Sequence, residues 1–360
     1  MPSSLFTPLA AGALKLPNRV VMAPMTRNRA GADGVPGALM SQYYAQRATA
    51  GLIVTEGVGV SAVGAGPTGQ PGLHTLEQVA GWTKVTDAVH EAGGRIVAQL
   101  SHHGRIAHPA LLPDGVEPLA PSAVTALSDA RTAHGLVAAV RPRAMGPEDI
   151  ARTLDDFSDA ARAAMDAGFD GVEVQGGNGY LIHQFLSDNA NLREDGYGQD
   201  VPGRARFAVE AVRAVVRAVG AGRVGLRVSP GTGYNDAVEK DPAPLYGFLA
   251  DILGSEELAY LHVVEGPDRA LRAVLREHWN GVLISSPFTG EAPTDPGTAR
   301  GLVEAGDADA VSFARHFAAN PDLPERIRLG APLNEPDPDT FHDGGAAGYT
   351  DFAVHRPSAV

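Results

Sequence analysis

The sequence predicts an α/β protein with the (β/α)8 architecture of a TIM barrel, because eight short apolar segments alternate with helical patterns along the chain. Each segment is too short for a buried helix and rich in Val, Ile and Leu. None shows the polar–apolar alternation of a half-exposed strand, as expected for parallel strands buried on both faces. An open doubly wound sheet is the alternative, but the turn after the first strand lacks the G-x-G-x-x-G pattern that such a sheet usually carries.

The expected strands are RVVMAP (19–24), GLIVTEG (51–57), RIVAQL (95–100), GVEVQ (171–175), RVGLRVSP (223–230), LAYLHVV (258–264), GVLISS (281–286) and ADAVSFA (308–314). The expected helices cover 38–49, 76–93, 147–168, 203–220, 242–254, 268–279 and 298–306. The segment 101–146, called here the capping segment, follows the third strand and has little helical periodicity. Because loops of this length are usually functional, we expect it to cap the barrel mouth. We expect a single domain over residues 1–360 that ends in a C-terminal tail, 331–360.

Composition excludes several classes of function. A formal net charge of -13 would repel a phosphate backbone, so we expect no nucleic-acid partner. No window approaches the run of about 18 apolar residues that indicates a membrane span, and we expect a cytoplasmic protein. The absence of Cys rules out disulfides and thiolate nucleophiles. The chemistry must come from other side chains or from a bound cofactor.

In a barrel the reaction site lies at the carboxyl ends of the strands. The polar residues at those ends are Thr26, Arg27, Glu56, Gln99, Ser101, His102, His103, Arg105, Gln175, Asn178, Tyr180, Arg227, His262, Glu265 and Arg315. Arg227 is the most informative, because a buried guanidinium needs either an acidic neighbour or an anionic ligand. Thr26, His262 and Glu265 are as easily explained as groups that satisfy backbone atoms at the barrel end.

The chain resembles the Old Yellow Enzyme family of ene-reductases, which depend on flavin mononucleotide (FMN), almost from end to end. The resemblance lies in the segments LFTPLAAGALKLPNRVVMAPMTRNRA, YYAQRATAGLIVTEG, GWTKVTDAVHEAGGRIVAQL, VEVQGGNGYL, ARFAVEAVRAVVRAVGAGRVGLRVSP, LAYLHVVE and ANPDLPERIRLGAPLNEPD. It implies an FMN-loaded barrel with a short N-terminal hairpin over its floor. It also implies that hydride passes from NAD(P)H to an activated C=C bond.

The resemblance assigns cofactor roles to matching positions. Pro24, Thr26 and Gly57 would lie along the isoalloxazine ring, and Gln99 would bind its pyrimidine end. Arg227 would face N1 and O2, where negative charge builds up in the reduced flavin. The phosphate would lie at Ser286, Ala314 and Arg315.

The resemblance also assigns catalytic roles within VEVQGGNGYL. Two donors would polarise the substrate carbonyl, and Tyr180 would give a proton to the α-carbon. Asn178 and Tyr180 match the family pattern, whereas Gln175 stands where most members have His. An amide still donates N–H, but the Gln side chain has more rotational freedom than His. The amide also cannot take up an additional proton near neutral pH. Ser101 and His103 complete the expected substrate-binding set, and Ser101 in place of a bulky aromatic suggests a roomier pocket.

Two hypotheses concern the neighbouring histidines. His103 or His183 is a candidate to compensate for the missing His at position 175. The cluster of His102, His103 and His108 is not predicted to bind a metal, because adjacent side chains diverge and no carboxylate stands at helical spacing.

Three departures from the family pattern keep a second function open. Ala314 replaces a usual Gly, the loop SSPFTGEAPTDP after the seventh strand is long, and Pro287 has no N–H to offer a phosphate. Together with Gln175 they support a repurposed barrel that has weak or no FMN and performs an isomerisation, dehydration or cyclisation. A non-catalytic barrel that binds a small molecule is a third possibility. The FMN-dependent oxidoreductase remains the leading prediction.

Overall fold

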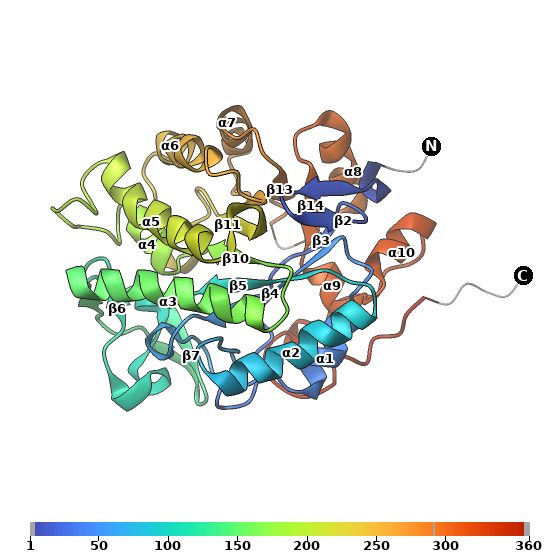
Figure 1. Ribbon diagram of the computed structural model, residues 1–360, viewed down its shortest axis with the longest axis horizontal. Coiled ribbons are helices and arrows are strands. Elements are labelled where there is room, and N and C mark those ends of the chain that lie inside the picture. Colours follow the sequence, from blue (N-terminus) through green and yellow to red (C-terminus); the bar gives the residue numbers. More distant parts are fainter. Residues whose placement is uncertain (1–3, 291, 356–360) are drawn as a thin grey trace, which may run out of the picture.

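The computed structural model describes residues 4–290 and 292–355, in which eight parallel strands form a closed barrel surrounded by helices (Figure 1). The barrel strands are β3 (Val20–Met22), β4 (Leu52–Gly59), β5 (Ile96–Ser101), β10 (Gly171–Gln175), β11 (Val224–Val228), β12 (Tyr260–Val264), β13 (Leu283–Ser286) and β14 (Ala310–Phe313). Each of them lies within or overlaps a predicted segment. The strands follow one another in chain order around the barrel, and β14 pairs with β3 to close it. The predicted fold class is confirmed.

Seven long helices match the predicted patterns. They are α1 (Ala38–Ala45), α2 (Leu76–Glu91), α3 (Pro147–Asp166), α5 (Val201–Val219), α6 (Pro242–Gly254), α7 (Ala270–His278) and α8 (Pro296–Ala305). Three short helices have no counterpart among the predictions, namely α4 (Leu181–Leu186), α9 (Arg315–Ala319) and α10 (Leu323–Leu329). Short 3-10 turns are η1 (Ser4–Phe6), η2 (Ala62–Gly64), η3 (Gly104–Ile106), η4 (Pro109–Leu111), η5 (Pro113–Gly115), η6 (Ala221–Arg223), η7 (Tyr234–Asp236) and η8 (Pro338–Thr340).

A two-stranded hairpin closes the amino end of the barrel. Its strands are β1 (Leu9–Ala11) and β2 (Leu14–Leu16), and the turn between them contains Gly12 at a φ of 57°. A Cβ at Gly12 would lie 2.5 Å from the carbonyl oxygen of Gly222, which precedes β11, so only glycine fits this approach. Leu14 and Leu16 pack into the apolar cluster that fills the lower barrel. The predicted floor hairpin is therefore present.

The capping segment contains two small strand pairs in addition to the short turns η3, η4 and η5. Strand β6 (Leu119–Ala120) pairs with β9 (Arg143–Ala144), and β7 (Asp129–Thr132) pairs with β8 (Gly135–Ala138). The guanidinium of Arg105 donates to the carbonyl oxygen of Asp236 at 2.6 Å, and the N–H of Leu127 donates to the Asp236 carboxylate at 3.0 Å. Because Asp236 follows the carboxyl end of β11, these bonds hold the segment over the barrel mouth.

The C-terminal tail folds back to the loop that follows β3. Arg27 donates to the carbonyl oxygens of Phe341 and Gly348, both at 2.8 Å, and Arg29 donates to that of Thr340 at 2.9 Å. The ring of Tyr349 in the tail stacks on Tyr43 of α1, with centroids 4.0 Å apart, and Figure 1 shows the tail running beside that helix. The last five residues of the predicted tail, 356–360, lie outside the described part of the chain.

Candidate active site

A polar layer crosses the barrel interior below its mouth. Alternate residues of a barrel strand point inward, so Glu173 in the middle of β10 faces the interior. Its carboxylate accepts bonds from Gln99 Nε2 at 2.7 Å and from His262 Nδ1 at 2.8 Å. His262 Nε2 is in turn bonded to Ser312 Oγ at 2.9 Å. We call these four side chains the Glu173 network, which explains His262 as an interior structural group.

Glu173 is the acidic neighbour that Arg227 requires. Burial opposes ionisation of Glu173, but His262 and Arg227 outweigh that effect and hold the pKa of the carboxyl below its usual value. Burial also lowers the pKa of Arg227, and the charge of Glu173 opposes that shift. Glu173 was not among the predicted site residues, although its spacing of two residues from Gln175 placed both on one face of the strand. Within the described residues, the buried Nε of Arg227 still has no hydrogen-bond partner.

The barrel mouth contains a cavity of about 210 Å³. Five of the predicted site residues line it, namely Asn178, Arg227, Ser286, Ala314 and Arg315. They come from the ends of four strands that are far apart in the sequence, and the structure brings them together. Ala314 has a φ of -100°, so its backbone lies outside the left-handed region that favours glycine. Pro287 also lines the cavity, as expected.

Glu265 lines the same cavity, but both of its carboxylate oxygens already accept hydrogen bonds. Arg272 of α7 donates to both of its carboxylate oxygens, at 2.8 and 2.9 Å, and the hydroxyl of Ser285 donates at 2.5 Å. Glu265 is therefore paired with two side chains rather than with backbone groups of the barrel end.

The residues after β10 form a rigid turn, 176–180, which we call the Asn178 turn. Asn178 has a φ of 57°, and its backbone N–H donates to Ser229 Oγ at 2.6 Å. Its carbonyl oxygen accepts from Asn235 Nδ2 at 2.8 Å, and the carbonyl oxygen of Gly179 accepts from Gln184 Nε2 at 2.8 Å. Side chains of the segment after β11, Ser229 and Asn235, and of α4, Gln184, therefore fix the backbone that carries Asn178 and Tyr180.

His183 lies beneath this turn rather than at the barrel mouth. Its Nδ1 accepts the N–H of Gly179 at 2.8 Å, and its Nε2 lies 2.5 Å from a carboxylate oxygen of Glu239. Tyr246 donates to the same oxygen at 2.6 Å. Both ring nitrogens of His183 are already paired, so His183 is unsuited to replace a substrate donor and His103 is the remaining candidate.

His103 contacts the predicted proton donor. The ring centroids of His103 and Tyr180 are 4.5 Å apart. Burial lowers the pKa of His103 to about 4, so the imidazole is neutral at neutral pH. Burial raises the pKa of Tyr180, partly offset by Asn235, so the phenol keeps the proton that a donor must hold.

The remaining predicted cofactor residues lie on one side of the mouth. Pro24 and Thr26 follow β3 and are partly exposed. Gly57 pairs in register with Gln99, and a Cβ at Gly57 would lie 3.4 Å from the side chain of Ser101. The structure thus places these residues around the upper barrel, whereas Arg27 turns away from the mouth to bind the tail.

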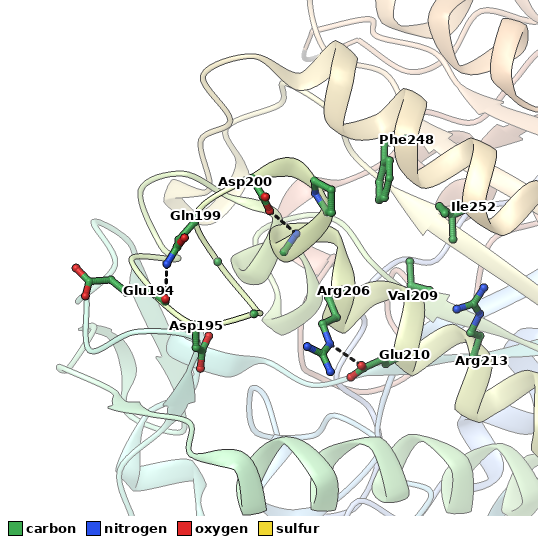
Figure 2. Close-up of a pocket in the computed structure, with 14 residues that line it drawn as sticks. Glu194, Asp195, Gln199, Asp200, Arg206, Val209, Glu210, Arg213, Phe248 and Ile252 are labelled. Carbon is green, nitrogen blue, oxygen red and sulfur yellow. Dashed lines mark hydrogen bonds and ion pairs between the residues drawn. The ribbon is translucent and has the colours of Figure 1, made fainter.

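A larger cavity of about 610 Å³ lies outside the barrel, between the start of α5 and α6 (Figure 2). Arg206 and Glu210 in its lining form an ion pair at 2.8 Å. The described residues contain no group of three or more metal-ligating side chains that could hold an ion. Within the same residues, no helix is both long and apolar enough to cross a membrane.

Comparison with known proteins gives matches over nearly the whole chain. The model of the NADH:flavin oxidoreductase / NADH oxidase family matches residues 4–334. A probable flavin mononucleotide-dependent alkene reductase of Leishmania infantum is 43% identical, over 97% of this chain and 96% of that protein.

Two solved structures are similar as well. Morphinone reductase in complex with tetrahydroNAD superposes with a TM-score of 0.93 at 44% identity, covering 98% of both chains. The old yellow enzyme homologue of Zymomonas mobilis has a TM-score of 0.94 at 37% identity and covers 98% of this chain and 100% of that one.

Proposed function

The chain belongs to the NADH:flavin oxidoreductase / NADH oxidase family, and we propose that it is an FMN-dependent oxidoreductase that passes hydride from NAD(P)H to an activated C=C bond. The observation that carries this assignment is the cavity at the barrel mouth, where Asn178, Arg227, Ser286, Ala314 and Arg315 meet. The resemblance to the Old Yellow Enzyme family is confirmed by these relatives.

The polar groups at the mouth fit FMN. Arg227 offers a buried Nε without a partner among the described residues, which suits the electron-rich edge of a flavin. Gln99 uses its N–H to bond Glu173, which leaves its carbonyl oxygen for the N–H of the pyrimidine ring. We assign Pro24, Thr26 and Gly57 to the ring, and Ser286, Ala314 and Arg315 to the phosphate. When bound, FMN supplies the two-electron carrier that no side chain of this protein can provide.

The Asn178 turn supports the substrate half of the reaction. Gln175 and Asn178 are assigned to donate N–H groups to the substrate carbonyl, which stabilises the negative charge that develops on its oxygen. Tyr180 is assigned to protonate the α-carbon, and its raised pKa keeps the phenol protonated until then. Ser101 and His103 are assigned to the wall of the substrate pocket.

The relatives do not favour a repurposed barrel without redox chemistry. Ala314 does not adopt the left-handed conformation that favours glycine, and Gln175 keeps a donor at the right strand end. A single domain and a cytoplasmic location stay part of the proposal, and the supply of NAD(P)H inside cells supports the latter.

The test is spectroscopic. The purified protein, or the protein after addition of FMN, is expected to show a bound-flavin spectrum that NADH or NADPH bleaches without oxygen and that 2-cyclohexenone restores. Arg227→Met is expected to weaken FMN binding by at least about tenfold, while the exposed Arg217→Met leaves it unchanged. A colourless protein that takes up no FMN would overturn the assignment.

A further inference from the structure

The buried imidazole of His103 contacts both Tyr180 and the loop that follows β4. Only 5% of the surface of His103 is exposed, and its ring lies against that of Tyr180, with centroids 4.5 Å apart and 59° between the planes. A Cβ added at Gly66 would lie 2.2 Å from Cε1 and 2.6 Å from Nδ1 of His103, so the Gly66 backbone packs directly on the imidazole. Within the described residues, Nδ1 has no hydrogen-bond partner. The contacts with Tyr180 and Gly66, rather than a bond at this nitrogen, therefore orient the ring.

The loop that presents Gly66 is itself held in place. The carbonyl oxygen of Gly64 accepts the backbone N–H of His103 at 3.1 Å, and the N–H of Gly66 donates to Gln70 Oε1 at 2.6 Å. Nε2 of Gln70 donates in turn to the carbonyl oxygen of Gly57 in β4, at 2.9 Å. Because these bonds tie the loop to a barrel strand and to the backbone of His103, the loop can support the imidazole.

The backbones that carry His103 and Tyr180 are joined as well. Nε2 of Gln184 in α4 donates to the carbonyl oxygen of His103 at 3.0 Å and to that of Gly179 at 2.8 Å. Gly179 directly precedes Tyr180, so one amide fixes both backbones. The freedom that remains to the phenol is rotation of its side chain, and the ring of His103 limits that rotation.

Reduction of a C=C bond adds one hydride and one proton, and the proton is assigned to Tyr180. Transfer of a proton to carbon needs the O–H bond to point at that carbon at close range. We propose that His103, supported by Gly66, is a positioning residue that holds the Tyr180 ring in the orientation for this transfer. The inference rests on the proposed function. Solvent afterwards returns a proton to Tyr180, so no further reactant is needed.

The proposal affects only one half of the catalytic cycle. Reduction of the flavin by NAD(P)H uses no proton from Tyr180, whereas reoxidation by an enone does. A change at His103 should therefore alter the second half-reaction alone. General damage to the barrel mouth would slow both.

The experiment follows the flavin absorbance of the FMN-loaded enzyme in each half-reaction. His103→Ala is expected to slow reoxidation by saturating 2-cyclohexenone by about tenfold or more, because a small misplacement of reacting groups is costly. Reduction by NADH should keep its rate, and so should reoxidation by ferricyanide, which takes up electrons without a proton. His134→Ala, in the exposed turn between β7 and β8, is the matched control.

A conservative replacement separates the contact from the ring nitrogens. Met has a volume similar to that of His, fits irregular gaps and makes favourable sulfur–aromatic contacts. His103→Met is therefore expected to reoxidise with 2-cyclohexenone within about threefold of the unmodified enzyme. A rate as low as that of His103→Ala would overturn the positioning role, because it would assign the effect to the imidazole nitrogens.

Gly66→Ala tests the support of the ring independently. The added Cβ would overlap the imidazole, and we expect reoxidation by 2-cyclohexenone to slow by at least about threefold. In the His103→Ala background the ring is absent, so Gly66→Ala should cause no further loss. Gly301→Ala on α8, where a Cβ would meet nothing within 4 Å, is the matched control.

The failures are distinguishable. An unchanged rate of reoxidation by 2-cyclohexenone in His103→Ala, or an equal loss in both half-reactions, overturns the role of His103 while leaving the oxidoreductase in place. If His103→Ala does not load FMN, an unchanged rate in Gly66→Ala overturns it. Absence of flavin reduction by NAD(P)H in the unmodified protein would instead refute the proposed function.

Discussion

Glu173 shows how one interior residue serves two neighbours. Its carboxylate fixes the direction of the Gln99 amide, at 2.7 Å, and compensates the charge of Arg227. A cation beside a flavin favours the reduced anion, and a nearby carboxylate reduces that effect. With Gln99 and Arg227 assigned to FMN as proposed, the network would set both the orientation and the electrostatics of the flavin site.

Glu173→Gln is expected to raise the reduction potential of the bound flavin by about 30 mV or more, because 30 mV corresponds to about 1.4 kcal/mol for a two-electron couple. Equilibration with a reference dye measures it. The exposed Glu277→Gln on α7 should leave the potential unchanged. An unchanged reduction potential in Glu173→Gln would show that Glu173 does not offset the positive charge of Arg227 at the flavin.

Glu56 makes the protein's stability depend on pH. Its carboxylate accepts the N–H groups of Arg27 and Asn28, at 3.0 and 2.9 Å, and burial raises its pKa from 4.5 to about 7. A carboxyl with a raised pKa in the folded state stabilises that state below pH 4.5, and the contribution is lost as pH rises to about 7.

Glu56→Gln stays neutral and removes this dependence. Between pH 5 and 8 we expect the free energy of unfolding of the unmodified protein to fall relative to that of the variant. The expected fall is on the order of 3 kcal/mol at ~1.36 kcal/mol per pKa unit. Denaturant titrations at several pH values test this, with the exposed Glu91→Gln as control. Parallel curves for Glu56→Gln and the unmodified protein would contradict it.

At the scale of elements, the Asn178 turn depends on α4, the short helix that follows it. His183 in this helix accepts the N–H of Gly179 through Nδ1 and contacts Glu239 through Nε2. The side-chain amide of Asn can take the place of Nδ1, and that of Gln can take the place of Nε2. The two substitutions therefore separate the support of the turn from the contact with Glu239.

His183→Gln loses the acceptor for Gly179 and is expected to lower kcat/KM by about tenfold or more, because a small displacement of reacting groups is costly. His183→Asn keeps that acceptor and should retain more of the activity. Steady-state kinetics at matched FMN occupancy measure the difference, and thermal unfolding reports the structural cost of each variant. A larger loss of kcat/KM in His183→Asn than in His183→Gln would contradict the role of Nδ1.

The strands were predictable because burial on both faces leaves a recognisable apolar run, as in GVEVQ for β10. Helices of five to seven residues, such as α9 and α4, show too few turns to establish a period. Contacts between distant segments leave no local pattern in the sequence. Arg27 was therefore predicted at the barrel mouth, whereas its side chain binds the tail. The role of His183 beneath the Asn178 turn was hidden for the same reason, since Glu239 lies 56 residues away.

At the scale of the whole molecule, the tail is held by buried arginines. Arg27 donates to two tail carbonyl oxygens and, at 2.9 Å, to the hydroxyl of Tyr43. Arg27→Lys lacks the planar fork that makes these three bonds. We expect it to lower the free energy of unfolding by about 2–4 kcal/mol, since hydrogen bonds to charged groups contribute about 1.5–3 kcal/mol each.

Denaturant unfolding and limited proteolysis of the tail measure this loss, and the exposed Arg217→Lys on α5 serves as the matched control. Unaltered stability together with an unaltered rate of tail cleavage would mean that the tail is held by other contacts.

The clamp between Arg27 and the tail also bears on when the enzyme is completed during synthesis. Arg27 and Arg29 precede their carbonyl partners, Gly348 and Thr340, by 321 and 311 residues. Strand β14, which closes the barrel onto β3, is translated shortly before them. The loop that carries Thr26 therefore reaches its final support only after the strand that closes the barrel has been synthesised.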